Sequence, residues 1–178
     1  MKKKIAIYPG TFDPFTNGHL DLVVRGLRIF DEVIVALAPS QKKSPLFTVE
    51  ERLSLIEKSI KQYDRVSYAV FDGLLVEYVK EKKGLAIIRG LRAVSDFEYE
   101  LQMALMNRRL LSEIETTFMM PSEEYSYLTA TIIKEIASLG GCVKGLVPLP
   151  VERALNEKFG RMKSDNCRRQ IEHGGYGS

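Results

Sequence analysis

The 178-residue length fits one folded domain, because a chain of this size buries about two-thirds of the surface that it exposes when unfolded. Its 45% hydrophobic and 28% charged residues match ordinary globular domains and exclude a disordered or fibrous protein. The net charge of +3 is small, and residues 161–178 supply +2 of it through four basic and two acidic side chains, so a broad nucleic-acid-binding face is not expected.

The longest apolar runs, 33–38 and 85–88, are far shorter than the ~20 residues that cross a membrane. The apolar run after the basic start ends at Pro9, which is too early for the core of a secretory signal. We therefore expect a cytoplasmic protein without a membrane span. We expect a single domain over residues 1–160 and a flexible basic tail over 161–178.

Predicted strands alternate with predicted helices along most of the chain. Short apolar runs indicate strands, and apolar residues at helical spacing indicate helices. In chain order the predicted elements are a strand over 5–8, a helix capped by Thr16 or Asn17 and reaching Phe30, a strand over 33–38, a helix over 48–60, a strand over 66–71, a helix over 74–82, a strand over 85–88, a long helix from Ser95, a strand over 116–120, and helices over 129–139 and 151–159. This alternation predicts an α/β fold, a Rossmann-like open parallel sheet of about five strands with helices on both faces.

Local signals set several of these boundaries. Pro9 and Gly10 are expected to stop the first strand. Thr48, followed by Glu51 three residues later, forms a capping box that opens a helix. In the long helix, Phe97, Leu101, Ala104, Leu105 and Arg108 fall on one stripe.

Polar residues gather where the predicted parallel strands end, which is the edge where ligands bind such sheets. They are Thr11 and His19 after the first strand, Lys42 and Lys43 after the second, Arg89 and Arg92 after the fourth, and residues 126–131 after the fifth. Arginine offers forked hydrogen bonds and lysine a mobile charge, so this edge suits a ligand rich in phosphate oxygens.

His19 is predicted in the first turn of a helix, where free backbone N–H groups and the helix dipole favour an anion. Gly18 beside it lets a nucleotide approach the backbone closely. Taken alone, such a histidine is more often a capping or surface residue. The residues around it form a recognisable motif, which favours the functional interpretation.

The segment Gly10–His19 resembles the first signature of the nucleotidyltransferase superfamily, in which a His-x-Gly-His element binds a nucleotide triphosphate. Here the element reads Thr16-Asn17-Gly18-His19, with Thr in place of the first His. This variant is similar to bacterial phosphopantetheine adenylyltransferases, as are the segments 8–14, 88–93 and 96–100. The resemblance runs from about Ile5 to Phe159.

The resemblance implies transfer of an adenylyl group from ATP to 4′-phosphopantetheine, which gives dephospho-coenzyme A and pyrophosphate. It implies His19 as the catalytic residue, which stabilises the transition state. It implies that 4′-phosphopantetheine is bound by Thr11, Lys43, Leu75 and Arg89. ATP would be bound by Thr11, Phe12, His19, Gly90, Leu91, Arg92, Glu100, Tyr125, Ser126, Tyr127, Leu128, Thr129, Ala130 and Thr131.

Mg²⁺ would accompany the triphosphate, although the sequence identifies no metal ligands. The family assembles as a homohexamer, and coenzyme A is a candidate feedback ligand. The second signature of the superfamily reads Leu128-Thr129-Ala130-Thr131 here, with alanine where a central hydroxyl is usual. The two threonines and the backbone N–H groups are expected to form the phosphate-binding segment.

Three alternatives remain open at this point. Two belong to the same superfamily: an adenylyltransferase acting on nicotinate mononucleotide, and a cytidylyltransferase acting on a small phosphoester. The third is a non-catalytic nucleotide-binding or RNA-binding module. The Arg89–Arg92 element and the acidic residues after it favour the phosphopantetheine acceptor, and we expect no nucleic-acid partner.

Overall fold

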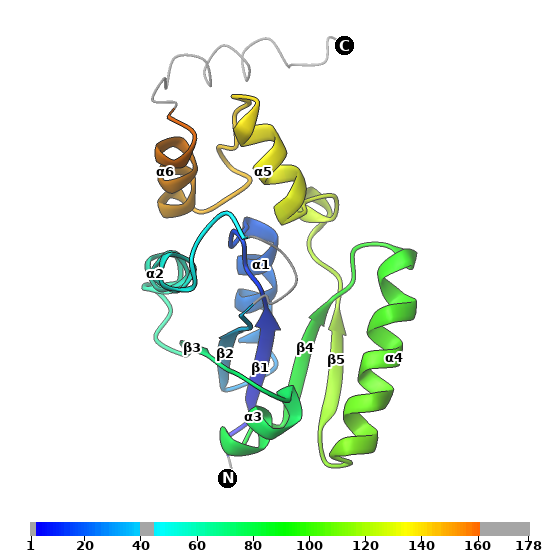
Figure 1. Cartoon of the computed structure of the whole chain (residues 1–178). Coiled ribbons are helices and arrows are strands. Elements are labelled where there is room, and N and C mark those ends of the chain that lie inside the picture. The colour runs from blue at the N-terminus through cyan, green and yellow to red at the C-terminus, as the bar shows by residue number, and fades with distance from the viewer. Residues whose placement is uncertain (1–2, 40–44, 161–178) are drawn as a thin grey trace.

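The computed structural model describes residues 3–39 and 45–160 (Figure 1). Five parallel strands form one sheet in the order β3-β2-β1-β4-β5. The strands are β1 Ile5–Gly10, β2 Glu32–Leu37, β3 Val66–Val70, β4 Ala86–Gly90 and β5 Glu115–Met119. The helices are α1 Asn17–Gly26, α2 Val49–Ile60, α3 Leu75–Glu81, α4 Val94–Leu110, α5 Ala130–Ser138 and α6 Leu149–Lys158, with a 3₁₀ turn at Glu123–Tyr125.

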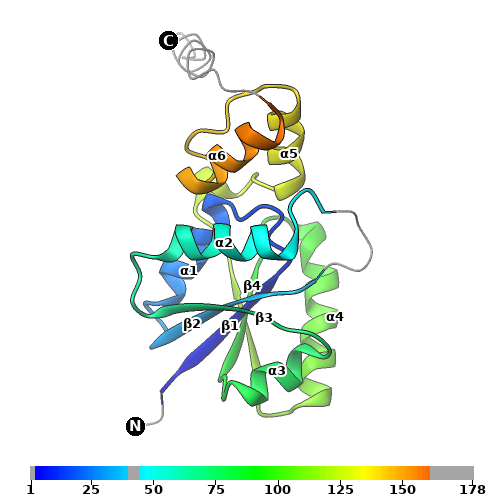
Figure 2. The same ribbon diagram turned by 60° about the vertical axis from the view of Figure 1, so that its left-hand side comes forward.

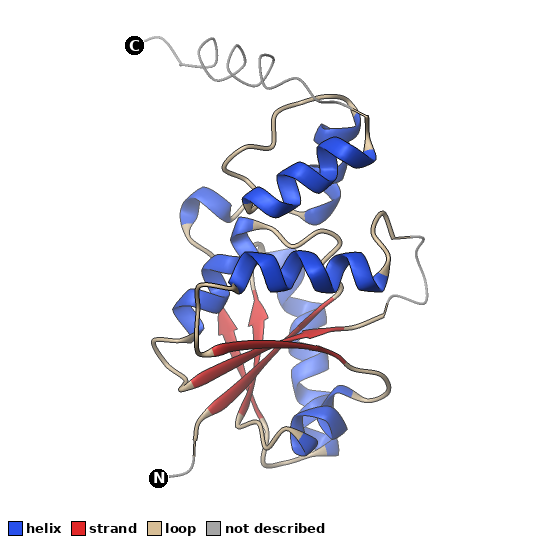
Figure 3. Ribbon diagram, turned by 90° about the vertical axis from the view of Figure 1, so that its left-hand side faces the viewer, coloured by secondary structure: helices blue, strands red, loops and turns tan. Residues whose placement is uncertain are grey.

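The sheet is covered on both faces, as the sequence predicts (Figure 3). Neighbouring residues of β4 point to opposite sides, because side chains alternate along a strand. Ile88 belongs to the apolar cluster that contains α1, α2, α5 and α6, whereas Ile87 belongs to the cluster that contains α3. The central strands are therefore buried on both faces of the sheet, which explains their nearly continuous apolar sequences.

The β1 strand is longer than predicted, because it continues through Pro9 and Gly10, which pair with Ala36 and Leu37 of β2. Proline lacks the N–H that a central strand normally donates. Its nitrogen lies on the side of β4, where the pairing of β1 extends only as far as Ile7, so no ladder bond is lost. The β4 strand likewise continues beyond Ile88, and Arg89 lies within it.

Helix α1 begins after Thr16, one of the two predicted caps, and α2 begins with the predicted Thr48–Glu51 capping box. The α1 helix ends at Gly26, so Phe30 lies outside it, in the turns that lead to β2. Phe30 is still buried, and the apolar spacing that predicted a longer helix reflects this burial.

The predicted stripe of α4 packs only partly against the sheet of its own chain, where the Phe97 ring lies 6.3 Å from the Phe118 ring of β5. Phe97 and Leu101 are exposed, and Leu105 keeps 57% of its surface. Helical spacing indicates which residues share a face, but it does not indicate what covers that face. The apolar side of α4 is therefore open in the single chain.

Helices α5 and α6 lie beyond the carboxyl ends of the strands (Figures 1 and 2). They share an apolar cluster with α1 and α2, and Lys158 of α6 contacts Glu51 of α2 at 2.8 Å. The predicted domain boundary at 160 stays a prediction, and the predicted tail 161–178 lies outside the described residues. No described helix is long and apolar enough to cross a membrane.

Candidate active site

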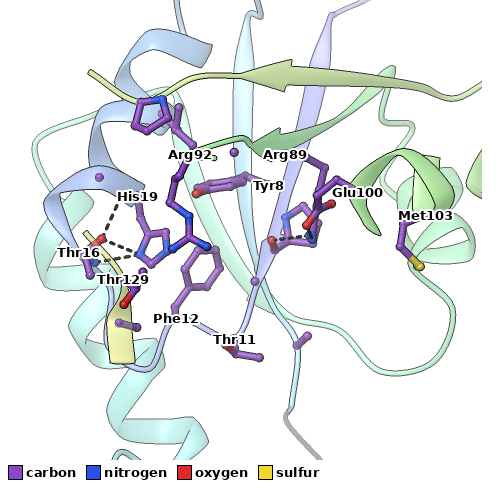
Figure 4. A pocket seen from close by; sticks show the side chains of 18 of the residues that line it. Tyr8, Thr11, Phe12, Thr16, His19, Arg89, Arg92, Glu100, Met103 and Thr129 are labelled. Atoms are coloured by element: carbon purple, nitrogen blue, oxygen red, sulfur yellow. Dashed lines mark hydrogen bonds and ion pairs between the residues drawn. The ribbon is translucent and has the colours of Figure 1, made fainter. Parts of the chain in front are cut away.

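A cavity of about 720 Å³ lies at the carboxyl ends of β1 and β4 (Figure 4). The predicted site residues that line it are Thr11, Phe12, His19, Leu75, Arg89, Gly90, Arg92, Glu100, Tyr125, Leu128, Thr129, Ala130 and Thr131. Leu91, Ser126 and Tyr127 do not line it. Lys43, predicted for the acceptor, lies outside the described residues, as does Lys42.

An aromatic shell forms the wall around His19. Phe12 adopts a left-handed backbone conformation with φ of 46°, which is uncommon for a residue with a bulky side chain. Its ring folds back over Gly10, where any Cβ would stand 2.8 Å from a ring carbon. The ring then meets the His19 ring edge-on at 5.2 Å, and the Phe15 ring lies 5.6 Å from His19. Glycine at position 10 is therefore required for this packing.

His19 is fixed by a reciprocal capping box with Thr16. The Thr16 backbone N–H donates to His19 Nδ1 at 3.0 Å, and the His19 backbone N–H donates to Thr16 Oγ1 at 3.3 Å. Because Nδ1 accepts a hydrogen bond, this geometry assigns the ring proton to Nε2. The sequence predicted His19 in the first turn, but it did not predict that its own side chain takes part in the cap.

The environment of His19 keeps the ring neutral. Burial, and secondarily the nearby charge of Arg92, lower the pKa of His19 from 6.5 to about 4. At neutral pH the ring is therefore an uncharged N–H donor. It can donate a hydrogen bond to a phosphate oxygen, but it cannot provide a positive charge before the ligand binds.

The two arginines reach the cavity from one strand end, and each is held by a carboxylate of α4. Arg89 makes a forked contact with Glu100, with N–O distances of 2.6 and 2.5 Å. Arg92 contacts Asp96 at 3.1 Å and also donates to the Leu128 carbonyl at 3.4 Å. The guanidinium groups are thus positioned before any ligand arrives. Glu100, predicted to bind ATP, is placed here as the partner of Arg89.

Helix α5 points its N-terminus at the cavity. Thr129 caps it, since its hydroxyl oxygen accepts a hydrogen bond from the Ile132 N–H at 3.0 Å. The neighbouring Ala130 and Thr131 also line the cavity. The Thr129 oxygen accepts within the helix, but its O–H remains a donor, so this hydroxyl, Thr131 and the early backbone N–H groups are available to an anion.

An ion pair between Asp13 and Lys134 anchors the loop that contains Thr11. Asp13 accepts hydrogen bonds from the Leu46 and Phe47 N–H groups, each at 3.0 Å, and from Lys134 Nζ at 2.7 Å. Burial alone would raise the pKa of Asp13, but Lys134 and these backbone donors outweigh it and lower the pKa. These contacts join the β1 loop to the start of α2 and to α5.

Arg52 completes this support from α2. Its side chain is 1% exposed and donates to the Thr11 carbonyl at 2.8 Å. Within residues 3–39 and 45–160, no carboxylate forms an ion pair with it. Sequence reasoning gave Glu50, Glu51 and Arg52 no chemistry beyond opening the helix. The structure shows that Arg52 orients a residue of the cavity wall.

Sequence reasoning missed several residues that line the cavity. Tyr99, Met103 and Asn107 lie on one face of α4 at intervals of four, beside the predicted Glu100. This spacing was readable in the sequence, but only the apolar stripe that begins at Phe97 was predicted on this helix. Tyr8 and Phe71 also line the cavity. Each of the two ends an apolar run in the sequence, so the sequence pattern indicates an ordinary core residue.

The cavity therefore combines two cationic positions, a neutral N–H donor and a helix N-terminus within one space. Arg89 lies on the side of α3 and α4, whereas Arg92 lies beside His19 (Figure 4). Two guanidinium groups on either side of one space suit two phosphate-bearing molecules that meet in the middle.

The chain resembles known nucleotidyltransferases over most of its length. A family model described as cytidylyltransferase-like matches residues 7–136. The phosphopantetheine adenylyltransferase of Thermodesulfovibrio yellowstonii is 60% identical over 157 residues, which cover 88% of this chain and 98% of that protein. The protein of the same name from Geotalea daltonii is 54% identical over 161 residues, which cover 90% of this chain and 100% of that protein.

Among solved structures, one similar fold is that of a putative nicotinate-nucleotide adenylyltransferase from Vibrio parahaemolyticus. The TM-score is 0.67, with 20% sequence identity, and the match covers 91% of this chain and 98% of that chain. At this identity the similarity concerns the fold alone.

The lowered pKa of His19 makes the stability of the protein pH-dependent. Between pH 6.5 and about 4, the unfolded chain binds a proton at His19 that the folded chain does not bind, so the free energy of unfolding falls as the pH falls. The contribution of this residue between pH 7 and pH 5 is about 2 kcal/mol. We expect the free energy of unfolding of His19→Gln to fall by about 2 kcal/mol less than that of the natural protein between pH 7 and pH 5.

Chemical denaturation of both proteins at pH 7 and pH 5 measures the effect. The difference between the two pH values is compared for each protein, so any change that the substitution makes at both pH values cancels. An equal loss of unfolding free energy in the two proteins would contradict the neutral state of the partly buried His19.

Proposed function

The chain belongs to the cytidylyltransferase-like family and, within it, to the phosphopantetheine adenylyltransferases. On this basis we propose that its cavity holds ATP and 4′-phosphopantetheine side by side for direct transfer between them. The enzyme transfers the adenylyl group, and the products are dephospho-coenzyme A and pyrophosphate, in a step of coenzyme A biosynthesis. The observation that carries the assignment is the cavity itself, in which Arg89 and the pair His19–Arg92 approach one space from two sides.

The walls of the cavity differ in chemistry and thereby suggest where each substrate lies. On the side of α3 and α4 the lining residues are mostly apolar and include Phe71, Leu75 and Met103, with the Asn107 amide among them. This side suits the long pantetheine arm, whose phosphate would then meet Arg89. Lys43, outside the described residues, remains proposed for the same phosphate.

The other side suits the nucleotide. His19 in the first turn of α1 and the N-terminus of α5 both offer N–H donors to phosphate oxygens, and Arg92 lies beside them. Thr11 on its loop between the two sides would contact both substrates. The proposed ATP-binding residues Leu91, Ser126 and Tyr127 do not line the cavity, so they would contribute by supporting their neighbours.

The reaction needs no protein base. A phosphate monoester has a second pKa of about 6 and is already largely a dianion at neutral pH. One of its oxygens attacks the α-phosphorus of ATP in line, a new P–O bond forms, and the bond to the β-phosphate breaks as pyrophosphate leaves. No proton is removed, and no covalent enzyme intermediate forms. Catalysis then depends on positioning and on stabilising the charge at the α-phosphorus.

His19 would provide this stabilisation through Nε2–H. Its Nδ1 is fixed by Thr16, so the ring cannot turn its donor away from the cavity without losing that hydrogen bond. A neutral donor also suits the ground state, because it does not bind the triphosphate as strongly as a cation would. Its hydrogen bond strengthens as charge grows on the phosphate oxygens.

Mg²⁺ is proposed to enter with the triphosphate. The described residues contain no group of three or more His, Cys, Asp or Glu side chains arranged to hold a metal. The acidic side chain lining the cavity is Glu100, which is engaged by Arg89. This donor set fits an ion held mainly by phosphate oxygens and water, as Mg²⁺ prefers. The bound ion would neutralise charge on the triphosphate and on the leaving pyrophosphate.

We further propose that the protein assembles as a homohexamer and that coenzyme A is a feedback ligand. We also propose a cytoplasmic location and no nucleic-acid partner. Coenzyme A carries both a pantetheine arm and an adenine nucleotide, so it matches both sides of the cavity. The open face of α4 supports self-association, because single chains rarely expose several large apolar side chains together.

Pyrophosphate release with a panel of substrates tests the reaction. We expect turnover with ATP and 4′-phosphopantetheine. With nicotinate mononucleotide as the acceptor we expect at least about 100-fold lower kcat/KM, because the apolar side of the cavity fits the pantetheine arm. We expect ATP to be preferred over CTP, because the relatives are named as adenylyltransferases. Activity only with nicotinate mononucleotide, or a preference for CTP, would select one of the two rival transferases. Nucleotide binding without turnover would indicate the non-catalytic module.

The role of His19 is tested by His19→Ala. We expect kcat to fall by about 10²- to 10³-fold, while the ATP dissociation constant changes less than about threefold, because the lost hydrogen bond acts mainly in the transition state. Isothermal titration calorimetry gives the affinity, and pyrophosphate release gives kcat. Equal losses in affinity and turnover would instead make His19 a ground-state binding residue.

Assembly through α4 is tested by Leu105→Lys, at a residue that is 57% exposed and does not line the cavity. We expect light scattering to give six times the 20.2 kDa chain mass for the natural protein and a smaller assembly for the variant. Ile29→Lys is the matched control, because Ile29 is 54% exposed but follows α1 and is not part of α4. A monomeric natural protein, or an unchanged mass for Leu105→Lys, would contradict this interface.

A further inference from the structure

Tyr8 lies on the floor of the cavity without a role in the reaction described above. It belongs to the central strand β1 and is 5% exposed. Its ring packs edge-on against Phe12 at 5.4 Å and lies 6.3 Å from the His19 ring. A phenylalanine would make these ring contacts equally well, so packing does not explain the hydroxyl.

The Tyr8 hydroxyl faces the cavity. In the described part of the chain, no group forms a hydrogen bond with it, and the one fully enclosed side-chain polar atom without a partner is the hydroxyl of Tyr78. The oxygen of Tyr8 is therefore not sealed in the core. A tyrosine hydroxyl that borders a cavity and has no partner within the protein keeps its O–H available to donate to a bound ligand.

The Tyr8 side chain lies between the two sides of the cavity. Figure 4 shows the Tyr8 side chain between Arg92 and Arg89. Burial raises the pKa of Tyr8 well above 10, although the nearby charges of Arg89 and then Arg92 act to lower it. The phenol therefore stays protonated at every working pH and remains a hydrogen-bond donor.

We propose that the Tyr8 hydroxyl donates a hydrogen bond to a non-bridging oxygen of the phosphorus that is attacked. The inference rests on the proposed function, which places the acceptor phosphate at Arg89 and the nucleotide phosphates at His19 and Arg92. The space above Tyr8 is where these phosphates meet. Tyr8 and His19 then act together as neutral donors to the same developing charge, whereas the arginines orient the two substrates.

Removal of the single oxygen atom, in Tyr8→Phe, tests the proposal because it leaves the ring packing in place. We expect kcat to fall by about 10- to 100-fold, the ATP dissociation constant to change by less than about threefold, and the thermal midpoint to stay or rise. Tyr78→Phe is the matched control. It removes another buried, unpartnered tyrosine hydroxyl, but one that does not line the cavity, and its kcat should equal that of the natural protein.

Two results would overturn the proposal. A kcat within threefold of the natural value would show that the hydroxyl does not touch the reacting phosphate. A loss of kcat together with a similar loss of ATP affinity and a lower thermal midpoint would assign Tyr8 a structural role. If the natural protein itself transfers no adenylyl group, the proposed function fails and this inference falls with it, which separates the two failures.

Discussion

The pairing of β1 with β4 is the constraint on which the active site depends. Ala6 and Ile7 pair with Ala86 and Ile87, so the two strands end side by side although their sequences are far apart. The loop with Thr11 and the first turn with His19 follow one strand, and the arginines end the other. Residues buried on both faces of the sheet fix this register, since a shift would move apolar side chains out of both clusters.

Charge in the cavity is balanced before any substrate binds. Arg89 and Arg92 are each held by a carboxylate of α4, and His19 is neutral because it is partly buried, next to one of them. The anionic substrates therefore meet oriented guanidinium groups with little reorganisation, which is the condition under which electrostatic stabilisation is most effective. In the proposed mechanism, binding strength would reside mainly in the cations, and the neutral donors would act on the charge that appears during the reaction.

Helix α4 links the site to the surface of the molecule. Glu100 and its neighbours on one face position Arg89 and line the cavity, whereas Leu101 and Leu105 remain exposed. A partner subunit that covered this second face would stabilise the helix that orients Arg89, the arginine proposed for the acceptor phosphate. On the other side, Asp13, Lys134 and Arg52 connect the Thr11 loop with α2 and α5, so the loop is held by elements from both halves of the chain.

The sequence by itself determined the alternating strands and helices, the cap at Thr48, two candidates for the first cap including Thr16, and thirteen of the residues that line the cavity. Apolar periodicity, capping and the motif are each encoded within a few neighbouring residues. Only the tertiary structure decided that Arg89 lies within β4, that Glu100 pairs with it, that Arg52 supports Thr11, and that Tyr8 and Tyr99 reach the cavity. These features join residues from separate elements. Their contacts depend on sheet register and helix packing, which no local pattern specifies.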